Sequence, residues 1–363
     1  MHTEGRLASL DILRGLDLWF LLMVGPLLHC VLGMTGTSGA AGSFIRYQMD
    51  HVVWSGFAAW DIIMPLFLFM SGITIPFSLS RYDRTLRPGK DFYLKLLRRF
   101  CLLFFLGWIV QGNLLKFDIR QFHPFANTLQ AIAVGYVVSA LMFVHLGRRG
   151  RLIATLAFFL AYLSAFVLTG MDLDPQSNVA MLIDKAVLGS HRDGVIWISA
   201  HEWVFDESYT YTWILSSLNF VVTVMSGCFA GEILTEGGRT PERKKAVRLL
   251  AVGAVLVCLG LAMHPFFPII KRIWSSSMTL YSAGVCYILM AVCYYLIDVR
   301  GCRWSLAWLK CFGMNSIVAY FVGEMLLSVH VPRIPLLASV AAKVVLLYVL
   351  MRIMYKYGCF LKV

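Results

Sequence analysis

The sequence predicts an all-α polytopic membrane protein with about ten transmembrane helices and a packed outer loop. Of its 363 residues, 59% are hydrophobic and only 14% are charged. The mean hydropathy is +0.73, and apolar stretches of about 20 residues, the length that crosses a bilayer, recur along the whole chain. Together these observations exclude an ordinary soluble domain.

Ten such stretches follow one another, and each predicts one membrane-spanning helix. The first contains Arg14 and Asp17, continues past residue 30 and shows no small-residue cleavage site, so we expect a span there and no cleavable signal peptide. No composition break divides the chain, which predicts a single transmembrane domain over residues 1–363. The expected spans are 12–33, 55–80, 96–115, 125–146, 151–170, 211–235, 245–264, 275–298, 306–329 and 335–356.

Basic residues alternate between the connections and indicate the orientation. Most of the 32 lysines and arginines follow the even-numbered spans or lie near the termini, which predicts that both termini are cytoplasmic. Because these residues are dispersed over short loops, the net charge of +12 does not indicate a nucleic-acid surface. The residues concerned are Arg81, Arg84, Arg87, Lys90, Lys95, Arg98 and Arg99, then Arg148, Arg149 and Arg151, then Arg239, Arg243, Lys244, Lys245 and Arg248, then Arg300 and Arg303.

This orientation leaves the connections 34–54 and 171–210 on the outer side. The second is too long for a simple connection, so we expect it to pack as a cap over the outer face. Acidic and aromatic side chains suit a cationic, ring-bearing ligand, but they also cap helix ends and fill a cap, and both interpretations stay open. The candidates for acceptor binding here are Asp184, Trp203, Asp206 and Glu207.

His51 and Asp61 are the most informative polar pair in the chain. His51 stands at the mouth of an apolar helix, and Asp61 is expected two to three helical turns deeper. An intramembrane carboxylate costs at least about 2.5–3.5 kcal/mol, so it indicates function by default. Histidine is the side chain best suited to move a proton near neutral pH. A polar pair that only packs two helices is the alternative.

Further polar groups interrupt several spans. They include Asp11 and Arg14, Gln111 and Asn113, Gln130, Asn219, Lys271 and Arg272, and Asn315, Ser316 and Glu324. Packing and topology account for many of them, yet their spread over many helices is what a water-filled tunnel requires. The nine cysteines show no spacing typical of zinc, so we expect small buried hydrophobes and no metal.

The motifs of common nucleophilic enzymes are missing from the sequence. There is no GxSxG elbow, no Walker glycine loop and no HExxH. A carboxylate-oriented histidine remains, and it suits proton removal from an amine or hydroxyl during acyl transfer. The rival interpretation is a proton-coupled carrier of a small anionic or sugar-linked solute, in which His51 and Asp61 form a proton relay. A purely structural membrane scaffold would not need the buried polar set.

A series of short motifs resembles the heparan-alpha-glucosaminide N-acetyltransferase family of transmembrane acyl transferases. The chain departs from the eukaryotic pattern of that family at Gly25, Ser55, Ala131 and Gly323, and its short N-terminus resembles the bacterial branch. The order and spacing persist over nearly the whole chain. The matching residues are Arg6–Gly15, His51–Gly56, Asp61–Pro65, Leu129–Gln130, Leu182–Lys185, Ala230–Leu234, Lys271 with Trp274–Ser275, Ile297–Gly301 and Gly313–Ser316.

The resemblance implies an acetyltransferase of a bacterial inner membrane. It implies transfer of acetyl from cytosolic acetyl-CoA to the amino or hydroxyl group of an extracytoplasmic sugar, with His51 catalytic. We expect Asp61 to orient His51, and fixed cations to hold the phosphates of CoA, drawn from Arg14, Arg81, Arg98, Arg99 and Lys310. The expected substrate-binding residues are Trp54, Asp184, Trp203, Asp206, Glu207, Lys271, Asn315, Ser316 and Glu324. The expected partners are acetyl-CoA, the sugar and the lipid bilayer, with a homodimer left open.

Overall fold

The computed structural model is almost entirely helical and describes residues 7–35, 39–82, 88–199, 201–237, 241–302, 304–329, 332 and 334–361. Within these residues the chain forms α1 Ala8–Trp19, α2 Gly25–Thr35, α3 Ala40–Met49, α4 Ile63–Leu79, α5 Lys90–Val110, α6 Thr128–His145, α7 Arg148–Leu168, α8 Val179–Leu188, β1 Val195–Trp197, β2 Trp203–Phe205, α9 Ser216–Thr235, α10 Glu242–Met263, α11 Ser276–Tyr294, α12 Lys310–Met314, α13 Ser316–Ser328 and α14 Leu336–Lys356. Arg6, Arg84, Arg87, Arg239 and Arg303, which the sequence argument used, lie outside this part of the chain.

All ten predicted spans coincide with helices, and eight of the described helices are long and apolar enough to cross a membrane. The first of these joins α1 and α2 through a π-helical turn, Phe20–Val24. The other two spans fall short for different reasons. In α5, Lys95, Arg98 and Arg99 interrupt the apolar stretch. The ninth span is broken at Asn315, which leaves α13 with only 13 residues.

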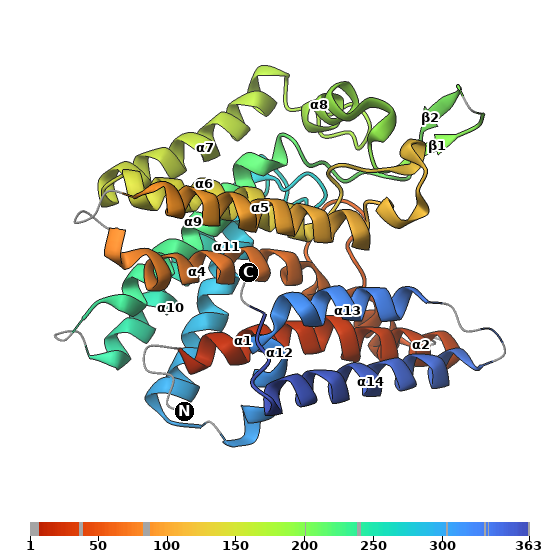
Figure 1. Ribbon diagram of the computed structural model, residues 1–363. Helices are drawn as coiled ribbons and strands as arrows, with labels where there is room; N and C mark the ends of the chain where they lie inside the picture. The colour runs from red at the N-terminus through yellow and green to blue at the C-terminus, as the bar shows by residue number, and fades with distance from the viewer. Residues whose placement is uncertain are drawn as a thin grey trace.

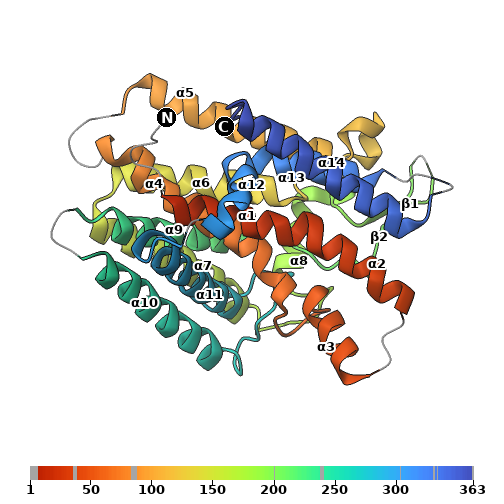
Figure 2. The ribbon, with the colours of Figure 1, turned by 90° about the horizontal axis from the view of Figure 1, so that it is seen from below.

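The helices form two groups that lie side by side (Figures 1 and 2), with α4, α5, α6, α7 and α9 in one and α1, α2, α13 and α14 in the other. Glycines allow the closest contact within the first group. A Cβ on Gly72 of α4 would meet the carbonyl oxygen of Val224 at 1.9 Å, and one on Gly227 of α9 would meet that of Phe69 at 1.9 Å. Small residues at such crossings let helices pack tightly where lipid gives no hydrophobic drive.

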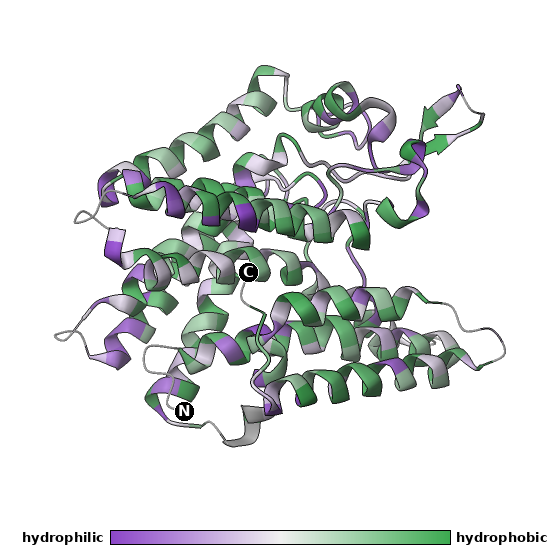
Figure 3. Ribbon diagram, viewed as in Figure 1, coloured by the Kyte–Doolittle hydropathy of each residue, from purple (hydrophilic) through white to green (hydrophobic). Residues whose placement is uncertain are grey.

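Most of each helix is apolar, and polar residues gather near the helix ends and in the connections (Figure 3). The predicted outer loop is packed but not purely helical. After α8 it forms an antiparallel hairpin in which Val195 pairs with Phe205 and Trp197 with Trp203. The all-α prediction included no strands. These short segments are rich in Val, Ile, Trp and Phe, which are typical strand formers. The Trp54 indole donates to the carbonyl of Leu173 over 3.1 Å and ties this cap to the loop that carries His51.

Candidate active site at the end of a chain of cavities

His51, Asp61 and Lys271 form a compact polar cluster. The Nδ1 atom of His51 lies 2.8 Å from Oδ1 of Asp61. Nζ of Lys271 lies 2.9 Å from Nδ1 and 3.3 Å from Nε2 of the same ring, and 3.4 Å from Oδ1 of Asp61. The side chains of Asp61 and Lys271 are 1% and 8% exposed, whereas that of His51 is 37% exposed. The ring therefore joins a buried ion pair to an accessible space.

The geometry differs from the predicted helix, in which Asp61 would lie turns away from His51. The chain from His51 to Ala58 is not helical, and the helical span begins with a 3-10 turn at Ala59–Ile62. Asp61 lies in this turn, and its Oδ2 accepts from the backbone N–H of Ala58 over 3.1 Å and of Val52 over 3.4 Å. The carboxylate thus holds the loop that carries His51 and the helix start together.

Lys271 is presented by a tightly held loop between α10 and α11. Ser275 accepts from the backbone N–H of Ile270 and donates to the carbonyl of Pro268. Tyr162 donates to the carbonyl of Ile273 over 2.6 Å. Trp274 has a φ of +54°, a left-handed conformation that is rare outside glycine and that clusters at functional sites. The surroundings therefore fix the loop and, through it, the lysine.

The Asp61 carboxylate indicates the tautomer of His51. Because Oδ1 of Asp61 can only accept a hydrogen bond, we assign the ring proton to Nδ1, which leaves the lone pair on Nε2. Burial, followed by the nearby Lys271 charge, lowers the pKa of His51 despite the hydrogen bond to Asp61. Burial also lowers the pKa of Lys271 to about 8, opposed by Asp61. At neutral pH the cluster thus holds a neutral imidazole, a carboxylate and an ammonium.

His51 and Lys271 open into a cavity of about 530 Å³, the histidine cavity. Trp60, Tyr211 and Trp213 give it an aromatic wall, and Asp193 and Glu324 contribute carboxylates. Its remaining lining residues are Leu21, Ile63, Met64, Phe67, Gln111, Asn113, Ala126, Thr128, Tyr209 and Tyr320. Acidic and aromatic groups around one open space suit a ligand with a cationic group and a ring.

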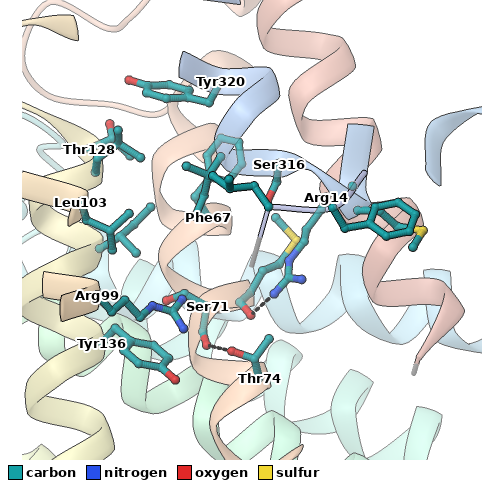
Figure 4. A pocket seen from close by; sticks show the side chains of 18 of the residues that line it. Arg14, Phe67, Ser71, Thr74, Arg99, Leu103, Thr128, Tyr136, Ser316 and Tyr320 are labelled. Carbon is teal, nitrogen blue, oxygen red and sulfur yellow. Dashed lines mark hydrogen bonds between the residues drawn. The ribbon is translucent and has the colours of Figure 1, made fainter. Parts of the chain in front are cut away.

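A second space of about 290 Å³, the middle cavity, lies between the two helix groups (Figure 4). Arg14 on α1 and Arg99 on α5 point into it, while Ser71 and Thr74 of α4 supply hydroxyls. Arg14 donates to the carbonyl of Met70 over 3.2 Å. The Arg99 guanidinium stacks on the ring of Tyr136 with 3.7 Å to the centroid, and its buried Nε has no hydrogen-bond partner.

A third space of about 330 Å³, the basic cavity, is lined by Arg81, Lys95, Arg98 and Arg99. It shares Arg99 and Tyr136 with the middle cavity. The middle cavity in turn shares Phe67, Thr128 and Tyr320 with the histidine cavity. The three cavities therefore adjoin one another, with the middle cavity between the histidine cavity and the basic cavity.

Together the three cavities run along α4 from one end to the other. Asp61 and Arg81 stand at opposite ends of the 24-residue span Ala59–Tyr82, which at 1.5 Å per residue is roughly 36 Å long. This length matches the thickness of a bilayer and part of its interface.

Several predicted site residues line these cavities and others do not. Glu324 and Lys271 line the histidine cavity, Ser316 and Arg14 the middle one, Arg81 and Arg98 the basic one, and Arg99 both of the last two. None of the three cavities is lined by Trp54, Trp203, Asp206, Glu207, Lys310, Asp184 or Asn315.

Two of the residues that line no cavity have clear structural contacts. Asp184 is buried and accepts from the backbone N–H groups of Trp213 and Ile214 just before α9. Burial raises its pKa to about 6. Asn315 bonds the backbone of Cys359 and Leu361 and so anchors the C-terminal segment at the middle cavity.

Sequence reasoning missed most of the wall of the histidine cavity. Trp60, Asp193, Tyr211 and Trp213 line it, and of these only Trp60 is adjacent in the chain to a predicted site residue, Asp61. Lys271 was expected to bind substrate but not to contact His51. No local sequence pattern could reveal this contact, because 220 residues separate Lys271 from His51 in the chain.

Among the residues that the structure describes, no group of three or more His, Cys, Asp or Glu side chains is arranged to hold a metal ion. Comparison with known families and with characterised proteins gives no match to this chain.

Proposed function

We propose that this protein is a membrane acetyltransferase that uses acetyl-CoA on one side of the bilayer and acetylates a sugar amine or hydroxyl on the other. One observation carries this proposal. A histidine–carboxylate pair with a buried lysine beside the ring lies at one end of three adjoining cavities, and a cluster of arginines and lysines lines the other end. The resemblance of the sequence motifs to transmembrane acyl transferases supports the same function.

The basic cavity suits the phosphates of CoA. Arg81, Lys95, Arg98 and Arg99 line it, and guanidinium groups bind phosphate through paired, charge-assisted hydrogen bonds. The Nε atom of Arg99, which has no hydrogen-bond partner among the described residues, is available for such a bond. In this proposal the phosphates bind among these side chains, and the pantetheine arm passes Arg14 and Phe67 toward His51.

In the proposed reaction, the unprotonated Nε2 of His51 acts as the base. The acceptor nitrogen or oxygen attacks the thioester carbonyl carbon while Nε2 removes its proton, and the carbon–sulfur bond breaks to release CoA. Asp61 stabilises the imidazolium through Nδ1–H and keeps the ring in this tautomer. The carboxylates of Asp193 and Glu324 and the ring of Trp60 provide a matching surface for an amino sugar.

The orientation of the chain follows from the same proposal. The basic cavity lies near the connections that carry most of the lysines and arginines, and such connections face the cytoplasm. The donor therefore enters from the cytoplasm and the acceptor from outside. We propose a bacterial inner membrane as the location, with both termini cytoplasmic.

A carrier is the second candidate, because adjoining cavities that cross the bilayer could also carry a small anionic or sugar-linked solute. In that case His51, Asp61 and Lys271 would relay a proton. Acetyl transfer and solute transport have different products, and one preparation can be tested for both.

The deciding experiment uses the purified full chain in liposomes with radiolabelled acetyl-CoA and a panel of amino sugars. We expect acetylated sugar, and a His51→Ala variant should lose about 10²–10⁴-fold in kcat while still binding acetyl-CoA. His29→Ala is the matched control, since His29 also pairs with an aspartate, Asp50, at 2.8 Å. Proton-coupled uptake without acetylation would support the carrier instead, and an isolated acetyl-His51 would indicate a two-step reaction.

A further inference from the structure

Lys271 is the one member of the polar cluster to which the mechanism above gives no task. Its ammonium is buried, yet it lies within hydrogen-bond distance of Nε2, the atom that must accept the proton of the acceptor. It also lines the histidine cavity together with His51. A lysine kept there at the cost of desolvation is expected to contribute more than packing.

The charge balance of the cluster suggests what the lysine does. Asp61 is the only carboxylate within salt-bridge distance of Lys271 or His51 among the described residues. One carboxylate can neutralise one cation, either the ammonium of Lys271 or the imidazolium of His51. A proton gained by His51 is therefore best accommodated when Lys271 gives one up.

Arg272 adds a second positive charge near the cluster. It lies next in the chain and, in addition to burial, lowers the pKa of both His51 and Lys271, while its guanidinium stacks over the ring of Tyr211 and donates to Thr210. Asp193 and Glu324 line the same cavity and form no salt bridge with Lys271 among the described residues. The exchange of a proton is thus confined to His51 and Lys271.

We propose that Lys271 is the general acid of the reaction, which protonates the departing thiolate of CoA and then recovers its proton from His51; this inference rests on the acetyltransferase function proposed above. As the acceptor attacks, Nε2 of His51 takes the acceptor's proton. The carbon–sulfur bond breaks, and Nζ of Lys271 gives a proton to the sulfur.

The cluster then resets without an external proton. His51 then gives up the proton that it gained, and the neutral amine of Lys271 regains the one that it lost; Nζ lies 2.9 Å from Nδ1 and 3.3 Å from Nε2 of the same ring. One proton has moved from the acceptor to the sulfur, and the total charge on His51, Asp61 and Lys271 is the same before and after turnover.

The test compares two donors that differ only in the leaving atom, acetyl-CoA and its seleno analogue. A selenol is a much stronger acid than a thiol, so a selenolate leaves without a general acid. Lys271→Met should lose about 10²–10⁴-fold in kcat with acetyl-CoA and recover most of that loss with the selenoester. His51→Ala should not recover, because its defect concerns the acceptor.

Two further variants separate an acid from a charge or a structural support. Lys271→Arg keeps the positive charge but cannot donate a proton, so it should be as slow as Lys271→Met with acetyl-CoA. Lys116→Met, on an exposed lysine that lines none of the three cavities, should have wild-type rates. Calorimetric binding of acetyl-CoA shows which variants are folded.

Three outcomes would overturn the inference. These are equal loss by Lys271→Met with both donors, rescue by Lys271→Arg with acetyl-CoA, and wild-type turnover by Lys271→Met. Failure of the proposed function is a different result, since the wild-type protein would then transfer acetyl to no acceptor from either donor.

Discussion

Replacement of Asp61 by asparagine tests how the carboxylate controls His51. The side chain keeps its size, but one of its two oxygens becomes an NH2 donor. Two backbone N–H groups, from Ala58 and Val52, point at the position of Oδ2 and require an acceptor there. The asparagine oxygen will therefore face the backbone, and its NH2 will face Nδ1 of His51. Nδ1 must then accept, which moves the ring proton to Nε2.

The expected loss is large because the wrong tautomer removes the base. With a proton on Nε2, His51 cannot take one from the acceptor, and the whole contribution of a positioned base, about 10²–10⁴-fold, is lost. The lost charge also removes the stabilisation of the imidazolium. We expect kcat to fall by about 10³-fold, or about 4 kcal/mol at 1.36 kcal/mol per tenfold change. Donor binding should persist, since Asp61 lines neither the middle nor the basic cavity.

The assay measures acetyl transfer to the best amino sugar acceptor of the wild-type protein, beside calorimetric binding of acetyl-CoA. Asp50→Asn is the matched control. Asp50 pairs with His29 at the same 2.8 Å distance, but both side chains are about half exposed and line none of the three cavities. It should keep turnover within about threefold. An Asp61→Asn protein that binds donor and retains a tenth or more of wild-type kcat would refute the tautomer argument.

Three other predictions concern the donor, the cap and the pH dependence. Arg99→Gln should raise the KM for acetyl-CoA about 10- to 100-fold, as expected for a lost charged hydrogen bond, while Arg120→Gln, on an exposed arginine paired with Asp118, should not change it. Asp184→Ala leaves the backbone N–H groups of Trp213 and Ile214 without their acceptor. It should lower the free energy of unfolding by about 1–3 kcal/mol per group without raising the KM for the acceptor. In a kcat/KM profile, activity should fall on the acidic side as His51 takes up a proton, and because burial lowers the pKa of His51 this fall should lie at a lower pH than for an ordinary histidine. It should also fall above about pH 8 as Lys271, whose pKa is about 8, loses the proton that it must donate. Lys271→Met should lose the alkaline decline.

The fold was largely predictable because hydropathy is a local property. Each of the ten spans corresponds to a helix, and the lipid environment leaves few alternatives to a helix for an apolar stretch of that length. The predicted helix boundaries are wrong where side-chain contacts outweigh the local preference for a helix. The second span begins at Ala59 and not at residue 55, because Asp61 bonds the backbone of Ala58 and Val52 and holds the preceding loop extended.

The active-site cluster was predictable only in part. His51 and Asp61 are close in sequence, so their association could be inferred even though the predicted helix between them was wrong. Lys271, Tyr211 and Trp213 come from the other half of the chain. Their position depends on how α10, α11 and the outer cap pack, which no local pattern encodes. The cavities could not be predicted for the same reason. Arg99 lines two of them only because α5 packs against α6.

Residue 25 is one of the positions at which this chain departs from the family that its motifs resemble. At residue 25 it has glycine where the eukaryotic pattern has asparagine, and the structure gives a steric reason. A Cβ at Gly25 would lie 2.1 Å from the ring of Trp60. That ring packs between His29 and His51, with centroid distances of 5.8 and 6.5 Å, and forms part of the histidine cavity. The glycine at residue 25 is therefore what leaves room for the Trp60 ring beside His51. An aromatic ring in this position favours a ligand with a cationic group, which the panel of amino sugars tests directly.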